Sequence, residues 1–450
     1  MISNIARVMV CASIVGLSPT VFVGAVAQAQ GSTTTLAVAG RYNANPSIAA
    51  RGNFAAVAWS GTLGSTMDIY VATSRDGGAK WSAPVQVNAT AGDARVSGEQ
   101  PPRVVLVAGR GATPEIVVVW GSKGTTGSRL LRARSTDGGK TFGASILVAG
   151  ADGEGNRGWE SLAADSSGRV YALWLDHRET VMPAAMHHQD GTTMPAAVPA
   201  AVPAAVPAAV PAAVPAPKID PNEKANKSQL YFGSLDGRAG VAARGIARGV
   251  CYCCKTSLVA SGGAIYAVWR HVFPGNQRDI GFTVSRDGGK TFSAITRVSE
   301  DHWQFDGCPE NGPAVAVDRQ QRTHVLWAAP VDGKDGSPLA LYHALTTDGK
   351  TFTARTQVPA RGPAGHVQVT AVSDGSLVIA WDENVSGTRH VAFARAVVNA
   401  AGRVTFSPVH AGDDDVGRGY PVVATAASGV LAAWVKQIPN GTTIGVARAQ

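Results

Sequence analysis

The most regular feature of the chain is a short apolar stretch that ends in tryptophan and is followed by polar residues. Seven copies are present: "FAAVAW" (54–59), "EIVVVW" (115–120), "VYALW" (170–174), "IYAVW" (265–269), "THVLW" (323–327), "SLVIAW" (376–381) and "VLAAW" (430–434). Successive tryptophans are about 53–61 residues apart, except for one long gap between Trp174 and Trp269. Valine and threonine are frequent and the runs end in turns, which favours strands. The pattern predicts an all-β protein of seven repeated units.

A second motif, S/T-x-D-G-x-x-W/F, follows most of these stretches. Its good copies are "SRDGGAKW" (74–81), "STDGGKTF" (135–142), "SRDGGKTF" (285–292) and "TTDGKTF" (346–352), and "SLDG" (234–237) is a degenerate one. In a hairpin turn, Ser and Asp oxygens accept backbone N–H bonds, Gly takes positive φ, and the aromatic residue packs into the sheet. The expected structural residues are Ser74, Asp76, Gly78, Trp81, Ser135, Asp137, Gly139, Phe142, Ser285, Asp287, Gly289, Phe292, Thr346, Asp348 and Phe352.

This motif resembles the Asp-box, or BNR repeat, of the sialidase-like β-propellers. The resemblance implies four-stranded blades in which the tryptophan strand is second and the Asp-box joins strands three and four. Seven tryptophan strands favour seven blades, and the alternative is the six blades of catalytic sialidases. The segment "TTTLAVAG" (33–40) is expected to supply the outer strand of the last blade and close the ring. Residues 30–450 would then form a single propeller domain.

The first 29 residues have the order of a cleaved signal peptide. Arg7 precedes an apolar run that Pro19 interrupts, and small residues follow at Ala27 and Ala29. We therefore expect a secreted or periplasmic protein without a membrane span. The net charge is +8, but the basic residues are scattered, so we expect no nucleic-acid partner. We expect a monomer.

Polar segments are predicted to gather on the face opposite the Asp-box turns. Connections alternate between the two faces of such a ring, so the links between blades share a face with the turns after the tryptophan strands. The segments concerned are "EQPPR" (99–103), "NRGWE" (156–160), "CYCCK" (251–255), "CPENGP" (308–313), "GHV" (365–367), "RGYP" (418–421), "LDHR" (175–178), "RHVFPGNQRD" (270–279) and "DEN" (382–384). A small ligand, a metal ion or a protein is the expected partner at this channel face.

Four cysteines of the mature chain belong to this face: Cys251, Cys253, Cys254 and Cys308. In an oxidising compartment they allow two disulfides, but they also allow a thiolate metal site. A disulfide from Cys308 to one of the other three would join adjacent blades. The sequence leaves both alternatives open, and a nucleophilic cysteine is disfavoured because oxidation would compete with it.

A long insertion, residues 179–227, is predicted between strands two and three of the third blade. Its PAAV repeats should form an extended spacer. Before them stand thioether and imidazole groups at Met182, Met186, His187, His188 and Met194. Such ligands suit copper in either oxidation state, with zinc as the alternative metal, or else the segment is an unconstrained linker. The combination of C-x-C-C, C-P and a His/Met loop is similar to a group of secreted BNR-repeat proteins.

The resemblance to sialidases also implies an activity, the hydrolysis of terminal sialic acids. Those enzymes use three arginines for the substrate carboxylate, a tyrosine nucleophile with a glutamate base, and an aspartate acid. The R-I/L-P motif is absent here, where "GRYNANPS" (40–47) stands instead. The candidates for such a site are Arg157, Arg270, Arg418, Tyr420, Glu310 and Glu383. Three functions thus stay open: a binding protein at the channel face that handles copper or another soft metal, an exo-α-sialidase, and a non-catalytic interaction scaffold.

Overall fold

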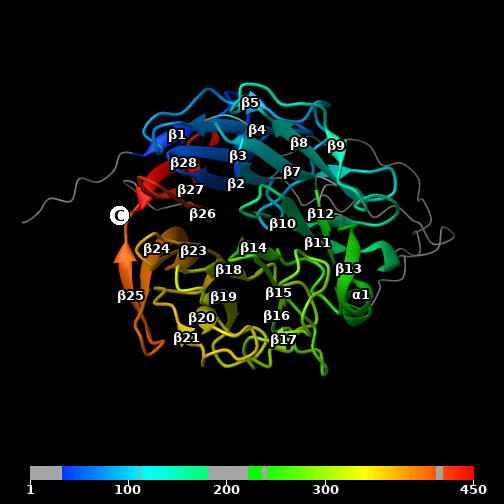
Figure 1. The fold of residues 1–450 in the computed structure, drawn as a ribbon, viewed down its shortest axis with the longest axis vertical. Coiled ribbons are helices and arrows are strands. Elements are labelled where there is room, and N and C mark those ends of the chain that lie inside the picture. The colour runs from blue at the N-terminus through cyan, green and yellow to red at the C-terminus, as the bar shows by residue number, and fades with distance from the viewer. Residues whose placement is uncertain are drawn as a thin grey trace, which may run out of the picture. The chain divides into compact units, whose positions relative to one another are not determined.

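The computed structural model describes residues 33–109, 111, 113–180, 221–235, 241–411 and 419–449. Within these residues, 28 strands form seven antiparallel four-stranded sheets. The sheets are arranged as blades around a common centre (Figure 1). The protein is a seven-bladed β-propeller, which confirms the seven blades that the tryptophan repeat predicts.

The first four blades are consecutive along the chain. Blade 1 contains β2 (Tyr42–Arg51), β3 (Phe54–Leu63), β4 (Thr66–Ser74) and β5 (Val85–Gln86). Blade 2 contains β6 (Arg103–Val107), β7 (Glu115–Lys123), β8 (Ser128–Ser135) and β9 (Ile146–Leu147). Blade 3 contains β10 (Arg157–Ala164), β11 (Val170–Asp176), β12 (Gln229–Ser234) and β13 (Arg244–Arg248). Blade 4 contains β14 (Ser257–Ser261), β15 (Ala264–Arg270), β16 (Ile280–Ser285) and β17 (Thr296–Arg297).

The remaining blades include the one that closes the ring. Blade 5 contains β18 (Ala314–Val317), β19 (Thr323–Pro330), β20 (Leu339–Thr346) and β21 (Thr356–Gln357). Blade 6 contains β22 (Ala364–Ala371), β23 (Leu377–Val385), β24 (Thr388–Val398) and β25 (Val404–Val409). Blade 7 contains β26 (Gly419–Ala426), β27 (Gly429–Ile438), β28 (Gly441–Ala449) and β1 (Thr34–Leu36). The predicted closure is confirmed, because β1 pairs with β28 through Thr34 and Val446.

The tryptophan strand is the second strand of every blade, as predicted, and its indole is buried between sheets. Trp327, for example, packs in one cluster with Phe282 of the preceding blade. Several indole N–H groups donate to an acceptor near the end of their strand, such as Asp176 for Trp174 and Glu383 for Trp381. Part of the polar sequence that follows each tryptophan is therefore committed to satisfying a buried donor.

The Asp-box turns have the predicted structure. In the turn of blade 2, the Ser135 hydroxyl donates to Asp137 at 2.7 Å and accepts the Gly139 N–H at 2.8 Å. The Thr141 N–H and hydroxyl both donate to Asp137, and these hydrogen bonds, the hydroxyl's first, hold the pKa of its carboxyl below the usual range. The same Ser–Asp bond occurs at Ser74–Asp76, Ser285–Asp287 and Thr346–Asp348.

Each Asp-box also contacts the preceding blade. Phe292 of blade 4 packs edge-on against Phe232 of blade 3, with ring centroids 4.9 Å apart. A Cβ on Gly289 would lie 2.4 Å from the same ring, so only glycine fits there. The repeat thus fixes both the hairpin of its own blade and the packing of that blade on its neighbour.

The third blade carries the predicted insertion between β11 and β12. The described parts of that connection are the short helix η1 (Arg178–Thr180) and the helix α1 (Pro221–Lys227). The His/Met segment, the PAAV spacer and the predicted signal peptide lie outside the described residues. No helix among the described residues is long and apolar enough to cross a membrane.

Candidate ligand site at the channel mouth

The end of the channel opposite the Asp-box turns, here called the mouth, is crossed by a tight turn at Ser97–Gln100. Ser97 and Gln100 exchange backbone hydrogen bonds in this turn, which leads into blade 2. The buried Glu99 accepts the N–H of Lys255 from blade 4 at 2.9 Å and that of Gly312 from blade 5 at 3.1 Å. A Cβ on Gly98 would lie 2.1 Å from the Tyr420 ring of blade 7. The turn therefore joins blades that are not neighbours in the ring.

The side chain of Lys255, from the segment that leads into blade 4, also reaches across the mouth. Its ammonium group donates to the backbone carbonyls of Gly312, Pro313 and Val367 at 2.8–3.1 Å. Burial lowers the pKa of Lys255 to about 8, and the charge of Glu99 opposes that effect. All three N–H donors of this lysine are thus used on the backbone of blades 5 and 6, so it positions the mouth and leaves no donor for a ligand.

Several residues at the mouth have a left-handed backbone without being glycine. Trp159, His366 and Tyr420 have φ of 56°, 52° and 49° and sit at β-bulges in the innermost strands β10, β22 and β26. Asn45 in β2 repeats the same arrangement. Bulges of this kind redirect side chains, and strained backbone of this kind gathers at functional sites. Each of the first three follows a glycine, a signal that was present in the sequence.

Tyr420 and His366 form a polar cluster with Asp382. The Nδ1 atom of His366 lies 2.9 and 3.0 Å from the two carboxylate oxygens of Asp382, and the backbone N–H of Tyr420 donates to the same carboxylate. The two rings are 4.2 Å apart between centroids. Burial raises the pKa of Tyr420, nearby Glu99 adds to this, and the Arg389 charge opposes it. The carboxylate orients the imidazole, as it does in acid–base and metal sites.

The cysteines form a buried cluster beside Trp159 and Tyr252. Cys253 and Cys308 form a disulfide between the segments that lead into blades 4 and 5, which is the link from Cys308 that the sequence allowed, but the second disulfide of that alternative is not formed by the described cysteines. Cys251 and Cys254 are free and buried, and their Sγ atoms are 3.1 Å apart. The Sγ atom of Cys251 is also 3.8 Å from that of Cys253. The Sγ atoms of these three cysteines all lie within 4.8 Å of one another, and two of them, those of Cys251 and Cys254, are free thiols that could share one ion.

The electrostatic surroundings differentiate the two free thiols. Burial raises the pKa of Cys251, but a hydrogen bond from Cys254 and the charges of Arg278 and Arg270 outweigh it and bring the pKa to about 7. Burial, together with the bond to Cys251, raises the pKa of Cys254 well above its usual value. Cys251 is therefore the thiol that ionises first.

Two of the arginines that were predicted to bind a substrate carboxylate instead donate hydrogen bonds to groups of the protein itself. Arg157 is buried and donates to the backbone carbonyls of residues 153–155 and to Asp176. Arg270 is buried and donates to the carbonyls of Arg278, Asn311 and Ala328. Neither arginine lines the channel cavity described below, and Arg418 lies outside the described residues.

The predicted glutamates have different surroundings. Glu383 accepts hydrogen bonds from Arg361 and from the Trp381 indole. Glu310 has φ of 47° and lies close enough to Tyr420 for its charge to raise the pKa of that phenol. Of the predicted tyrosine–glutamate pairs, the structure thus favours Tyr420 with Glu310.

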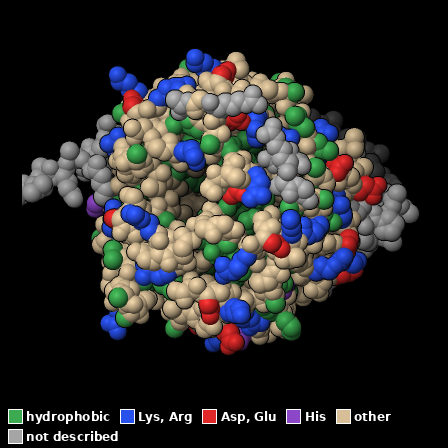
Figure 2. All heavy atoms as spheres, in the orientation of Figure 1, with side chains coloured by type: hydrophobic (Ala, Val, Ile, Leu, Met, Phe, Trp, Pro, Cys, Tyr) green, Lys and Arg blue, Asp and Glu red, His purple; other side chains and the backbone are tan. Residues whose placement is uncertain are grey.

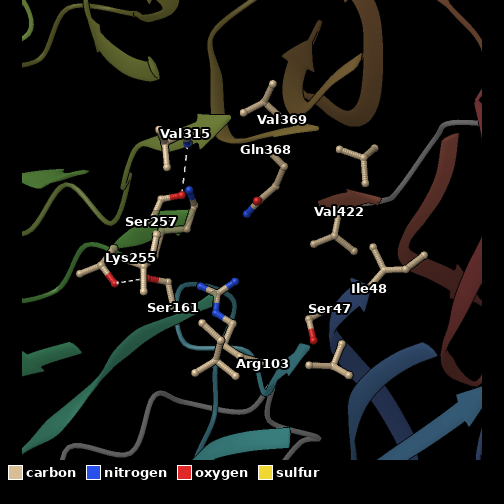
Figure 3. Close-up of a pocket in the computed structure, with 15 residues that line it drawn as sticks. Ser47, Ile48, Arg103, Ser161, Lys255, Ser257, Val315, Gln368, Val369 and Val422 are labelled. Carbon is tan, nitrogen blue, oxygen red and sulfur yellow. Dashed lines mark hydrogen bonds between the residues drawn. The ribbon is translucent and has the colours of Figure 1, made fainter. Parts of the chain in front are cut away.

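Below the crossing turn, the innermost strands enclose a cavity of about 180 Å³ (Figure 3). Each of the seven blades contributes to its wall. The lining residues are Ser47, Ile48, Arg103, Val104, Ser161, Leu162, Lys255, Thr256, Ser257, Leu258, Val315, Gln368, Val369, Val422 and Val423. Figure 2 shows one face of the ring, which is hollowed near its centre. Sequence reasoning named the segments that contain Arg103 and Lys255 but not these residues themselves.

Comparison with known proteins gives a fold and no family. No family model matches the chain, and no curated protein matches its sequence. A polysaccharide lyase of family PL25, an ulvan lyase, is similar with a TM-score of 0.50 at 10% identity over 92% of this chain and 93% of the lyase. The α-L-arabinofuranosidase Arb93A of Fusarium graminearum has a TM-score of 0.48 at 11% identity, over 93% and 97%.

A sialidase is also among the similar structures. A K499G mutant of NanB from Streptococcus pneumoniae has a TM-score of 0.44 at 10% identity, and the match covers 90% of this chain and 68% of that one. All three structures are carbohydrate-active enzymes by description. At such low identity the similarity shows the propeller fold alone, because propellers support many unrelated functions.

Proposed function

We propose that this protein binds a soft metal ion, copper(I) first, through cysteine thiolates at the mouth of its channel. The observation that carries the proposal is the pair of free buried thiols, Cys251 and Cys254, with Sγ atoms 3.1 Å apart. Thiolate sulfur is the donor that selects copper(I). The third sulfur atom near Cys251, that of Cys253, would join the ligand set if the disulfide were reduced.

The charges around the pair fit a copper ion. A copper(I) ion between two thiolates has a net charge of −1, and a buried anion needs compensation. The Arg278 guanidinium lies 3.8 Å from the Cys251 sulfur, and the positive charge of Arg270 also acts on that thiol. Zinc prefers four nitrogen or sulfur ligands. With Cys253 in a disulfide, the described residues offer two free thiols, so copper(I) fits better than zinc.

We further propose that the His/Met segment of the insertion collects the ion. The segment containing Met182, Met186, His187, His188 and Met194 belongs to the connection between β11 and β12. Thioether and imidazole donors accept both oxidation states of copper, whereas the thiol pair favours the reduced ion.

Titration with copper(I) against a chromogenic copper(I) chelator tests the proposal. We expect one tightly bound ion per chain, lost in Cys251→Ser and in Cys254→Ser. Cys308→Ser is the contrasting variant: it keeps the free pair and also frees the Cys253 thiol, 3.8 Å from the Cys251 sulfur, so a folded sample of it should keep the ion although it lacks the disulfide. No competition with the chelator, or equal loss in all three variants, would refute the cysteine site. Deletion of residues 182–194 should slow loading without removing the bound ion.

A second candidate, hydrolysis of sialosides, is favoured by the cluster of Tyr420, His366 and Asp382 beside Glu310. A phenol with an adjacent carboxylate is the pair that such hydrolysis uses. Release of sialic acid from a chromogenic α-sialoside, abolished in Tyr420→Phe but kept in the exposed Tyr42→Phe, would support it. Absence of release by the intact protein would eliminate this candidate.

A further inference from the structure

The four cysteines at the mouth form a continuous series of neighbouring sulfur atoms. The Sγ atom of Cys254 lies 3.1 Å from that of Cys251, which in turn lies 3.8 Å from that of Cys253. Cys253 is bonded to Cys308. A thiolate exchanges with a disulfide by direct attack on one of the two bonded sulfur atoms. Two free thiols thus stand next to a disulfide, in an arrangement that permits exchange in two successive steps.

The members of this series differ in their access to solvent. Cys251 and Cys254 each have an exposed fraction of 1%, and that of Cys253 is 5%. Cys308 is only partly buried. A reagent in solution therefore reaches the series first at Cys308, at the opposite end from the two free thiols.

The base of the insertion packs on the segment that carries the free thiols. The carbonyl of Ala225 in α1 accepts the N–H of Val250, and the Lys224 ammonium lies 4.3 Å from the centre of the Tyr252 ring. The helix α1 therefore contacts the residues on both sides of Cys251. This packing contributes to the burial of the pair and leaves Cys308 as the more accessible sulfur.

The charge next to Cys251 favours the nucleophilic form of its thiol. The Nη1 atom of Arg278, a fully buried residue, lies 3.8 Å from the Cys251 sulfur. A guanidinium beside a thiol stabilises the thiolate, which is the form that attacks a disulfide. Oxidation, which disfavours a nucleophilic cysteine at an open site, does not compete with this reaction, because the exchange conserves the number of disulfides.

We propose that the four cysteines form a thiol–disulfide relay, which moves one disulfide between the partly exposed Cys308 and the buried pair. In the first step, the Cys251 thiolate attacks the Cys253 sulfur, a bond forms between these two atoms, and Cys308 leaves as a thiolate. In the second step, the Cys254 thiolate attacks the Cys251 sulfur, and Cys253 leaves. Each leaving thiolate takes up the proton that the attacking thiol has lost. One disulfide and two thiols are present before and after, so no oxidant or reductant is consumed.

The position of the disulfide determines whether the buried pair can bind an ion. With the Cys253–Cys308 disulfide the pair is free, and with a Cys251–Cys254 disulfide it is closed. In the second state Cys308 offers a thiol with which an external disulfide can exchange. The relay uses sulfur atoms of the proposed metal site, but it does not require a metal, so the two proposals can fail separately.

Trapping with a water-soluble maleimide tests the relay on the metal-free protein. The native protein is incubated with the reagent without oxygen and quenched in acid, and its disulfides and alkylated cysteines are mapped by mass spectrometry of a digest. We expect Cys308 to become alkylated while a Cys251–Cys254 disulfide appears, because Cys308 is a thiol only after the exchange.

Two variants separate the two steps. Cys251→Ser removes the first attacking thiol and should abolish the alkylation of Cys308, although its Cys253–Cys308 disulfide is intact. Cys254→Ser is the matched variant, since it also removes one buried thiol, but it blocks the second step alone. It should give alkylated Cys308 together with a Cys251–Cys253 disulfide. Thermal unfolding before the reaction checks that both variants are folded.

Three outcomes would overturn the relay. The first is a parent protein in which Cys308 stays unmodified. The second is direct alkylation of Cys251 or Cys254 while the Cys253–Cys308 disulfide stays intact, because the pair would then be the accessible end. The third is equal alkylation of Cys308 in the parent and in Cys251→Ser. A protein that passes this test but binds no copper(I) in the chelator titration would refute the metal site alone.

Discussion

The two rims of the ring are built by the same repeat, yet they are held together in different ways. At the Asp-box rim, each turn closes on itself, as Ser135, Asp137 and Thr141 do, and packs against the preceding blade. At the mouth, Glu99 and Lys255 link backbone groups of blades that are not neighbours. The repeated contacts of the Asp-box rim define the fold, whereas the contacts across the ring at the mouth position the candidate site. The mouth should therefore be the rim where a single change affects the whole ring.

The largest expected effect at the mouth is loss of the disulfide in Cys308→Ser. The Cys253–Cys308 bond encloses a sequence separation of 55 residues, and loop entropy assigns about 4 kcal/mol of unfolding free energy to such a closure. Urea denaturation of the parent and the variant measures the difference. Cys254→Ser is the control, because it removes a buried thiol outside the disulfide. Equal destabilisation by both variants would show that packing and not the cross-link carries the effect.

Removal of the Glu99 carboxylate should cause the next largest loss of stability. Glu99→Ala leaves the N–H groups of Lys255 and Gly312 without their acceptor, which should cost about 2–3 kcal/mol of unfolding free energy. Glu99→Gln keeps an acceptor oxygen and should cost less. Glu300→Ala on the surface serves as the control, since that side chain is 76% exposed. A Glu99→Ala variant as stable as the control would mean that the turn does not hold the mouth.

As the pH falls, the buried imidazoles should lower the stability of the fold at a higher pH than the aspartates of the Asp-box rim do. Burial lowers the pKa of His177 and of His343 to about 3, while the unfolded chain takes up protons near pH 6.5. The unfolded state therefore binds more protons below that pH, and stability falls as pH drops from about 6.5 toward 3, by about 1.4 kcal/mol per pH unit for each histidine. The lowered pKa of Asp137 has an effect only below about pH 4, where the unfolded aspartate is protonated.

The buried carboxyl of Glu160 opposes this loss of stability at low pH. The pKa of Glu160 is raised to about 7 by burial, so the folded state takes up its proton first and gains stability as pH falls from 7 to about 4.5. Urea denaturation at pH 7, 6 and 5 should show a net loss that is steeper in Glu160→Gln and shallower in His343→Gln. An unchanged slope in His343→Gln would contradict the assignment of a neutral buried imidazole.

The smallest expected effect belongs to a single Asp-box. Asp137→Ala removes the acceptor of one hairpin turn, whose other bonds and neighbouring boxes are unaffected, and should cost about 1 kcal/mol. Asp152→Ala on the surface of the same blade is the control, and thermal unfolding is a sufficient measurement. A loss as large as that in Glu99→Ala would remove the distinction between the two rims.

The same distinction explains what the sequence could predict. Tryptophan strands and Asp-boxes occur several times, so the number of repeated units followed from their spacing. The propeller fold and its closing strand followed from the resemblance of the Asp-box motif. The contact between Glu99 and Gly312 occurs once and joins residues 213 positions apart, so no periodicity indicates it. The choice of Cys253 as the partner of Cys308 depends on backbone geometry within three closely spaced cysteines. The glycine before Trp159, His366 and Tyr420 was the one repeated signal of the mouth that could have been used.

The seam between β1 and β28 has a consequence for how the molecule is made. The three residues of β1 are among the first of the described chain to be synthesised, and their partners in β28 are among the last. Blades 1 to 6 can each form from a continuous segment, but the seventh has to wait until β28 has been synthesised. Until then β1 has no partner strand, and the apolar faces of blades 1 and 6 that blade 7 covers in the closed ring are exposed. A chaperone that covers such surfaces would act on the growing chain until the final strand is made.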